Sequence, residues 1–176
     1  MIIFTIGHST RTLHEFLEIL KKYKINQLID IRTMPRSRHN PQFNMNTFAK
    51  FLRNRKINYR HMKGLTGFRH AKKDSINSVF YNKSFRGFAD YMQTYKFKKN
   101  LKKLISYAKK KRIVLMCAEI LPFRCHRSLI GDALVAKHIV VKDIYNLNSV
   151  KNHEIRDFAK IRKDRSVYYP KMNQNL

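Results

Sequence analysis

The amino-acid sequence predicts an α/β fold. We expect a single domain with a mostly parallel sheet and helices on both faces, a three-layer, Rossmann-like arrangement. Short runs of β-branched and aromatic residues alternate along the chain with segments whose apolar residues recur at helical spacing. One of the runs, residues 113–117 (IVLMC), is almost entirely apolar, which is typical of a strand covered on both faces. A length of 176 residues suits one such domain.

The first half of the chain predicts three strands and two helices. The strands are expected at residues 2–7, 27–31 and 57–62. A helix should begin after Thr12, because Thr12 and Glu15 match a capping box ahead of an apolar stripe. A second helix should follow a loop over 32–43 that is rich in proline and arginine. The apolar residues of these two helices are Leu13, Phe16, Leu17 and Leu20, then Phe48, Phe51 and Leu52.

The second half of the chain predicts a long loop followed by further alternation. Residues 63–86 read as the loop, of a length that is usually functional inside a compact domain. We expect helices around 96–112 and 129–134, strands at 113–117 and 138–145, and a C-terminal helix carrying Ile155, Phe158 and Ile161. The domain should occupy residues 1–165, and residues 166–176 should form a tail.

No feature of the sequence predicts export or a membrane span. The first ten residues lack a basic region followed by a long apolar run, and no stretch approaches about 18 consecutive apolar residues. Two cysteines are too few for the disulfide framework of a small secreted protein. We therefore expect a cytoplasmic protein with reduced thiols and no membrane partner.

The charge of the chain is strongly positive. Lysine and arginine number 38 against 11 aspartates and glutamates, which gives a net charge of +27 with neutral histidines. Such a field attracts polyanions over about a Debye length, roughly 8 Å at physiological salt. Nucleic acid or a phosphate-bearing small molecule is the partner that this charge suggests. A lysine-rich composition without any such partner would give the same charge.

Chemically functional residues follow four of the predicted strands directly. His8 and Ser9 follow the first strand, and Asp30 and Arg32 lie at the end of the second. His61 closes the third strand, and Cys117 to Glu119 close the fourth. Because parallel strands gather ligands at their carboxyl ends, we expect these side chains to line one cleft.

Residues 115–128 contain both cysteines of the chain, Cys117 and Cys125. Cys125 is expected near the first turn of a helix, beside Arg124, His126 and Arg127. The helix dipole and these neighbours favour a thiolate, so the pattern predicts a reactive cysteine. Cys117 also fits a core position, because free cysteine is among the most buried residue types.

Two other kinds of site are less favoured at this stretch. The interval from Cys117 to Arg124 approximates the anion-binding loop of cysteine phosphatases and rhodaneses, but it is one residue longer than the phosphatase pattern and contains Pro122 and no glycine. Structural zinc prefers four ligands in paired short spacings, so no metal site is predicted. The donors that could converge in space are His8, His61, Cys117, Cys125 and His126.

The remaining polar candidates have both functional and structural interpretations. His8 suits a general base or a hydrogen-bonded loop histidine, because histidine titrates near neutrality. Asp30 and Arg32 suit substrate orientation or an internal ion pair. Arg36 and Arg38 suit phosphate contacts or an exposed basic loop.

The chain resembles the uncharacterised prokaryotic family called domain of unknown function 488 (DUF488) from about residue 3 to residue 145. Five segments carry the resemblance in the family's order: TIGHST, IDIRTMPRSRHNPQF, FRGFADYMQT, MCAE and RCHRSLIGDAL. The resemblance implies an α/β protein and marks recurrent polar positions, but it implies no particular reaction. These positions are His8, Ser9, Asp30, Arg32, Pro35, Arg36, Arg38, Arg86, Asp90, Tyr91, Cys117, Glu119, Cys125, His126 and Arg127.

One short segment departs from the family's pattern. Members often carry two adjacent glycines after a leucine, where this chain has Leu65-Thr66-Gly67. If that turn requires a positive φ at its first position, Thr66 would strain it, and the loop would be a poor ligand cradle.

Together these features predict an enzyme acting on a phosphate-bearing substrate, a nucleotide or nucleic acid, in a Cys/His/Arg cleft at the carboxyl edge of the sheet. Cys125 would be the nucleophile or redox centre, and the other catalytic candidates are Cys117, His8, Asp30, Glu119 and His126. The substrate-binding candidates are Ser9, Arg32, Arg36, Arg38, Arg86, Tyr91 and Arg127. The alternative is a noncatalytic nucleic-acid-binding module, in which the lysine-rich helix contacts phosphates and the cysteines are structural. The sequence does not indicate whether a cofactor binds or what the oligomeric state is.

Overall fold

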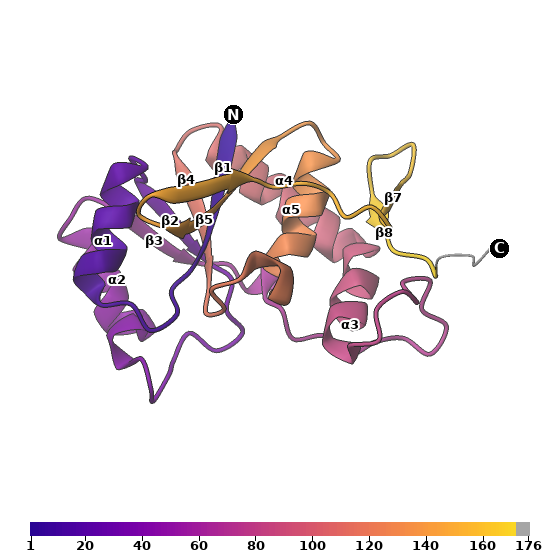
Figure 1. The fold of residues 1–176 in the computed structure, drawn as a ribbon, viewed down its shortest axis with the longest axis horizontal. Helices are drawn as coiled ribbons and strands as arrows, with labels where there is room; N and C mark the ends of the chain where they lie inside the picture. Colours follow the sequence, from indigo (N-terminus) through magenta and orange to yellow (C-terminus); the bar gives the residue numbers. More distant parts are fainter. Residues whose placement is uncertain (172–176) are drawn as a thin grey trace.

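Six strands form the central sheet of the computed structural model, which describes residues 1–171 (Figure 1). The sheet order is β3-β2-β4-β1-β5-β6. The first five strands pair in parallel, and β6 is antiparallel to β5. The strands are β1 (Ile2–Gly7), β2 (Gln27–Asp30), β3 (Asn58–His61), β4 (Ile113–Cys117), β5 (Val140–Asn146) and β6 (Ser149–Asn152).

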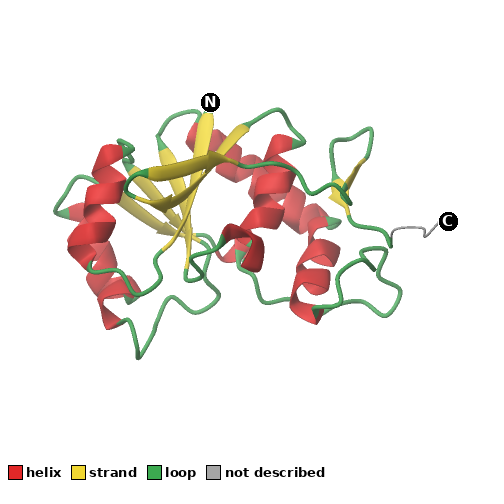
Figure 2. Ribbon diagram, viewed as in Figure 1, coloured by secondary structure: helices red, strands yellow, loops and turns green. Residues whose placement is uncertain are grey.

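Helices cover both faces of the sheet, as predicted (Figures 1 and 2). On one face lie α1 (Leu13–Lys22) and α2 (Met45–Arg53), which pack against Phe4 of β1. On the other face lie α3 (Lys83–Met92), α4 (Tyr95–Ala108) and α5 (Arg127–Val135), which pack against Ile3. Neighbouring residues of a strand point to opposite faces, so Ile3 and Phe4 belong to different cores. The three-layer α/β prediction is confirmed.

Local signals in the sequence explain where the helices begin. The Thr12 hydroxyl accepts a hydrogen bond from Glu15 N at 3.1 Å, and the Glu15 carboxylate accepts one from Thr12 N at 2.8 Å. This is the predicted capping box of α1. Along α4, Phe97, Leu101 and Leu104 are buried while the lysines remain exposed.

The prediction of a loop over residues 63–86 was wrong at its end. The segment contains a short 3₁₀ turn, η2 (Lys63–Leu65), and α3 begins at Lys83, where the Asn82 side chain accepts a hydrogen bond from Ser84 N at 2.8 Å. Phe88, Ala89 and Met92 are buried at helical spacing along α3, although Gly87 is unfavourable in the interior of a helix. Two further 3₁₀ turns are η1 (Pro41–Phe43) and η3 (Pro122–Arg124).

The predicted C-terminal helix was also wrong. Residues 153–159 are irregular, and Ile155 and Phe158 pack against the core without helical spacing. They lead into a two-stranded hairpin of β7 (Lys160–Ile161) and β8 (Val167–Tyr168). Part of the segment predicted as a tail is packed, because Tyr169 is fully buried; residues 172–176 lie outside the described residues. Within residues 1–171, no helix is both long enough and apolar enough to cross a membrane.

Candidate functional site

The carboxyl ends of β1, β2 and β4 meet at one edge of the sheet. His8 N donates a hydrogen bond to Cys117 O at 2.9 Å, and Ser9 N donates one to Ala118 O at 2.9 Å. Ile31 N donates to Met116 O at 3.0 Å. Parallel pairing therefore brings together the residues that follow three strands far apart in the chain.

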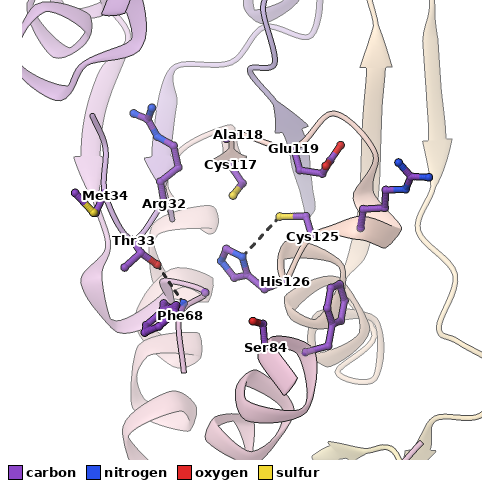
Figure 3. Close-up of a pocket in the computed structure, with 13 residues that line it drawn as sticks. Arg32, Thr33, Met34, Phe68, Ser84, Cys117, Ala118, Glu119, Cys125 and His126 are labelled. Atoms are coloured by element: carbon purple, nitrogen blue, oxygen red, sulfur yellow. Dashed lines mark hydrogen bonds between the residues drawn. The ribbon is translucent and has the colours of Figure 1, made fainter. Parts of the chain in front are cut away.

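A cleft of about 660 Å³ opens at this edge (Figure 3). Five of the predicted site residues line it: Arg32, Cys117, Glu119, Cys125 and His126. The sequence did not indicate several others, which come from the loops after β2 and η2 and from the first turn of α3. These are Thr33, Met34, Gly67, Phe68, Ser84 and Phe85. Sequence reasoning identified only that the loop after residue 63 was long enough to be functional.

Cys117, Cys125 and His126 form the chemical centre of the cleft. Their sulfur and nitrogen donor atoms all lie within 4.8 Å of one another. Cys125 Sγ is 3.6 Å from His126 Nδ1, and both sulfur atoms point toward the middle of the cleft in Figure 3. The other ring nitrogen, His126 Nε2, lies 3.2 Å from the carbonyl oxygen of Leu65. That carbonyl accepts only, so Nε2 carries a proton and Nδ1 faces Cys125.

The two thiols of this centre differ in acidity. The neighbouring thiol of Cys117, aided by His126 and the cation of Arg127, outweighs burial and lowers the pKa of Cys125 well below its usual range. The same thiol–thiol interaction, together with burial, raises the pKa of Cys117. The leading cause for Cys125 is therefore its partner thiol, which the sequence did not indicate, and the predicted neighbours His126 and Arg127 add to it.

His8, Asp30 and Arg32 form a buried group beside the cleft. Arg32 donates to the Asp30 carboxylate, with Nη2 2.6 Å from Oδ2, and the Tyr59 hydroxyl donates to the same oxygen at 2.6 Å. His8 Nδ1 donates to Ser9 O at 2.7 Å, so its Nε2 accepts from Arg32 Nη1 at 3.2 Å. Burial and neighbouring cations lower the pKa of His8 from 6.5 to about 4, which keeps the ring neutral.

These contacts give His8 and Asp30 a positioning role. Asp30 is fully buried and His8 is 2% exposed, and neither is among the residues that line the cleft. They fix the guanidinium of Arg32, which does line it. A direct proton-transfer role for His8 or Asp30 stays a prediction.

Arg127 and Glu119 shape the loop between β4 and α5. The guanidinium of Arg127 is fully buried and donates to the carbonyl oxygens of Glu119 and Ile120, the latter at 2.7 Å. The Glu119 carboxylate accepts a hydrogen bond from Leu121 N at 3.1 Å. A side chain at Gly7 would collide with this loop, because its Cβ would lie 1.9 Å from Glu119 O. Arg127 therefore stabilises the loop that borders the cleft, and its own side chain does not line the cleft.

The loop does not form a phosphatase-like cradle. Arg124 N donates to Leu121 O at 3.2 Å, and Cys125 N donates to Pro122 O at 2.9 Å. With Leu121 N bound to Glu119, these amides are used within the loop. They leave few inward N–H groups for an oxyanion.

The other predicted substrate-binding residues lie outside the cleft. Arg86 Nε donates to Phe80 O at 2.8 Å, and the Tyr91 hydroxyl donates to Gly64 O at 2.7 Å, so both hold surrounding loops. Ser9 occupies the turn after β1 with a positive φ of 49°. Arg36 and Arg38 are exposed and line a neighbouring hollow of about 470 Å³, which shares Met34 with the cleft.

The segment that departs from the DUF488 pattern is unstrained. Thr66 has a φ of −74°, an ordinary extended conformation, and its hydroxyl donates to Lys63 O at 3.0 Å. The turn does not require a positive φ at Thr66, so the condition for strain is not met, and the loop forms one wall of the cleft through Gly67 and Phe68.

The structure contains a second polar cluster that was not predicted from the sequence. His153 lies between two buried carboxylates, 2.8 Å from Asp143 Oδ2 and 2.9 Å from Asp132 Oδ1. Arg156 donates to the second Asp132 oxygen at 2.6 Å, as does the Tyr169 hydroxyl at 2.8 Å. The residues of this cluster are spread over 38 positions, from Asp132 to Tyr169, and form no sequence motif, so only the fold brings them together.

The model of one protein family matches this chain. It is described as domain of unknown function DUF488, and it matches residues 12–134, well over half of the chain. No curated protein and no solved structure matches the chain.

Proposed function

The chain belongs to the DUF488 family, and from its site we propose that it is an enzyme that acts on a phosphate-bearing substrate through the Cys/His cleft. The observation that carries the proposal is the convergence of Cys117, Cys125 and His126 on one open cleft of about 660 Å³. A cleft with a few convergent polar groups is the usual form of a catalytic site.

Cys125 is the nucleophile in this proposal. Its sulfur lies 3.6 Å from an imidazole nitrogen, the arrangement that activates a thiol through an adjacent base. The thiolate attacks an electrophilic atom of the substrate and forms a covalent bond to it. The bond from that atom to the leaving group breaks, and the leaving group receives the proton that His126 Nδ1 took from the thiol. Water then releases the product from the sulfur.

The charges around the cleft support an anionic substrate. The exposed side chain of Arg124 lines the cleft beside Cys125. Beyond Met34, the adjoining hollow carries Arg36 and Arg38. A nucleotide or a nucleic-acid strand that enters the cleft would place its phosphates along these three arginines. Arg32 and Arg127 are engaged internally, so they are assigned to positioning.

Alkylation of metal-free protein tests the nucleophile. We expect iodoacetamide to label Cys125 faster than Cys117, with a rate that stays high below about pH 8.5, where an ordinary thiol is mostly protonated. His126→Asn should slow the labelling of Cys125, whereas His70→Asn, at an exposed histidine, should not. Mass spectrometry of tryptic peptides measures both cysteines. If Cys125 reacts only after denaturation, it is a packing residue and the catalytic proposal fails.

Protection from the same reagent tests the substrate class. Nucleoside triphosphates should slow the alkylation of Cys125, and the corresponding nucleosides should not. Replacing Arg124 with glutamine should weaken this protection, whereas the same change at Arg53, an exposed arginine at the end of α2, should leave it intact. Equal protection by nucleosides would contradict a phosphate-bearing substrate.

A noncatalytic nucleic-acid-binding role is the second candidate. The observation that favours it is the outer face of α4, whose lysines are exposed along its length. In this role the phosphates of the nucleic acid contact α4, and the two thiols only stabilise the cleft.

A further inference from the structure

Two sulfurs and one imidazole nitrogen share a small volume at the wall of the cleft. We infer that Cys117, Cys125 and His126 form a three-ligand site for a thiophilic divalent cation, with Zn²⁺ as the best match. Two thiolates and an imidazole are a donor set that zinc uses in open sites, where the fourth position is taken by water or substrate.

The distances fit this assignment. Zinc binds sulfur at about 2.3 Å and imidazole nitrogen at about 2.0–2.1 Å, so tetrahedral angles separate a sulfur and a nitrogen ligand by about 3.5 Å. Cys125 Sγ and His126 Nδ1 are 3.6 Å apart. The whole set lies within 4.8 Å, and two sulfurs on one zinc ion are about 3.8 Å apart. Small rotations of side chains that already point at one another would complete the set.

The surroundings of His126 hold the ring in the orientation that a metal ligand needs. Its Nε2–H points at the Leu65 carbonyl oxygen, 3.2 Å away, which leaves the Nδ1 lone pair for the cation. Metal-binding histidines usually donate their second ring N–H to such a carbonyl or carboxylate. Phe88 packs against the same ring, with 4.9 Å between the ring centroids.

Gly67 gives the ring room on its remaining face. A Cβ at this position would lie 2.4 Å from His126 Nδ1 and 2.8 Å from both Cε1 and Cγ. These nearly equal distances put that carbon over the face of the ring and not along the Nδ1 lone pair. The glycine backbone therefore covers the ring while the direction toward Cys117 and Cys125 stays clear.

The fourth position of the cation would face the cleft. The three donors line the cleft wall, and Cys117 is partly exposed toward it. A cation there binds both sulfurs, so it would block alkylation of Cys125. The assignment does not depend on the proposed catalysis, because metal binding needs only the donor geometry.

Cobalt substitution tests the site directly. Metal-free protein titrated with Co²⁺ should take up one equivalent and develop the thiolate-to-cobalt charge-transfer absorption of a two-sulfur site. Zn²⁺ should then displace the cobalt and bleach the band. Cys117→Ser, Cys125→Ser and His126→Asn should each lower Zn²⁺ affinity by about 100-fold or more in competition with a chromophoric chelator. His70→Asn is the matched control, and circular dichroism checks the fold of each variant.

The outcomes separate this inference from the proposed function. Absence of the cobalt band, or a band of undiminished intensity in either serine variant, overturns the site; unchanged affinity in His126→Asn overturns the three-ligand assignment. If no cation binds but Cys125 still alkylates rapidly, the inference fails and the nucleophile proposal stands. If cations bind while metal-free Cys125 is unreactive, the inference stands and the nucleophile proposal fails. Gly67→Ala, which crowds the ring, should cost about tenfold in affinity.

Discussion

Raising the pH from 6 to 10 should remove about 3 kcal/mol of folding stability through one buried histidine. The side chain of His153 is 6% exposed and lies between Asp132 and Asp143, at 2.9 and 2.8 Å. Burial opposes its charged form, but the hydrogen bonds and charges of the two carboxylates prevail and raise the pKa of His153 from 6.5 to about 9. The folded chain therefore holds a proton on His153 that the unfolded chain loses.

The size of the effect follows from this difference in pKa. Each pH unit between the unfolded and folded pKa values changes the free energy of unfolding by about 1.4 kcal/mol, which gives about 3 kcal/mol over the interval from 6.5 to about 9. Between these values the folded state binds more protons, so stability falls as the pH rises. The stabilisation is complete below pH 6.5 and is lost above about pH 9.

Urea unfolding of the natural chain and of His153→Gln isolates this contribution. Other groups titrate over the same range, but their effects are common to both proteins and cancel in the difference. We expect the natural chain to be more stable than the variant at pH 6 and this advantage to shrink by about 3 kcal/mol at pH 10. His14→Gln, at an exposed position on α1, is the control and should not reproduce the loss of about 3 kcal/mol. An advantage that stays constant from pH 6 to pH 10 would refute the charged state of His153.

Two further predictions concern the surface and the long loop. Single-stranded DNA should bind at low salt and weaken as salt rises from roughly 50 to 200 mM, with a log–log slope of about −0.7 for each phosphate that the protein neutralises. In fluorescence anisotropy, neutralising four lysines on or just after α4 should weaken binding more than neutralising Arg36 and Arg38; absence of binding at low salt would show that the charge is compositional. The four are Lys102, Lys103, Lys109 and Lys110. Asp90→Asn should lower the free energy of unfolding by about 1–3 kcal/mol, because Asp90 accepts hydrogen bonds from Lys72 N, Ser75 Oγ and Asn77 Nδ2 at 2.8, 2.6 and 2.8 Å. Hydrogen exchange should accelerate over residues 72–77, and unchanged exchange there would contradict this role.

Local patterns in the sequence determined most of the fold. The capping box at Thr12 and the apolar run at 113–117 each fix their element through neighbouring residues, and both lie where they were predicted. Prediction from the sequence failed where apolar residues at helical spacing lie in irregular structure. Ile155 and Phe158 show helical spacing, yet they reach the core from an irregular segment, because burial alone does not require a helix.

The candidate site, like the fold, was predicted only in part. The positions of Cys117 at the end of β4 and of Cys125 and His126 after it could be predicted, because strand ends in a parallel sheet share one edge. Which side chains reach the cleft depended on pairing across the fold. Arg127 turned inward to bind backbone carbonyls, and His8 became a neutral partner of Arg32. These roles depend on hydrogen bonds between residues that are distant in the chain, and a sequence motif does not show such bonds. The sequence alone therefore determined the elements and the edge that carries the cleft, and tertiary contacts decided the acidity, orientation and access of each side chain there.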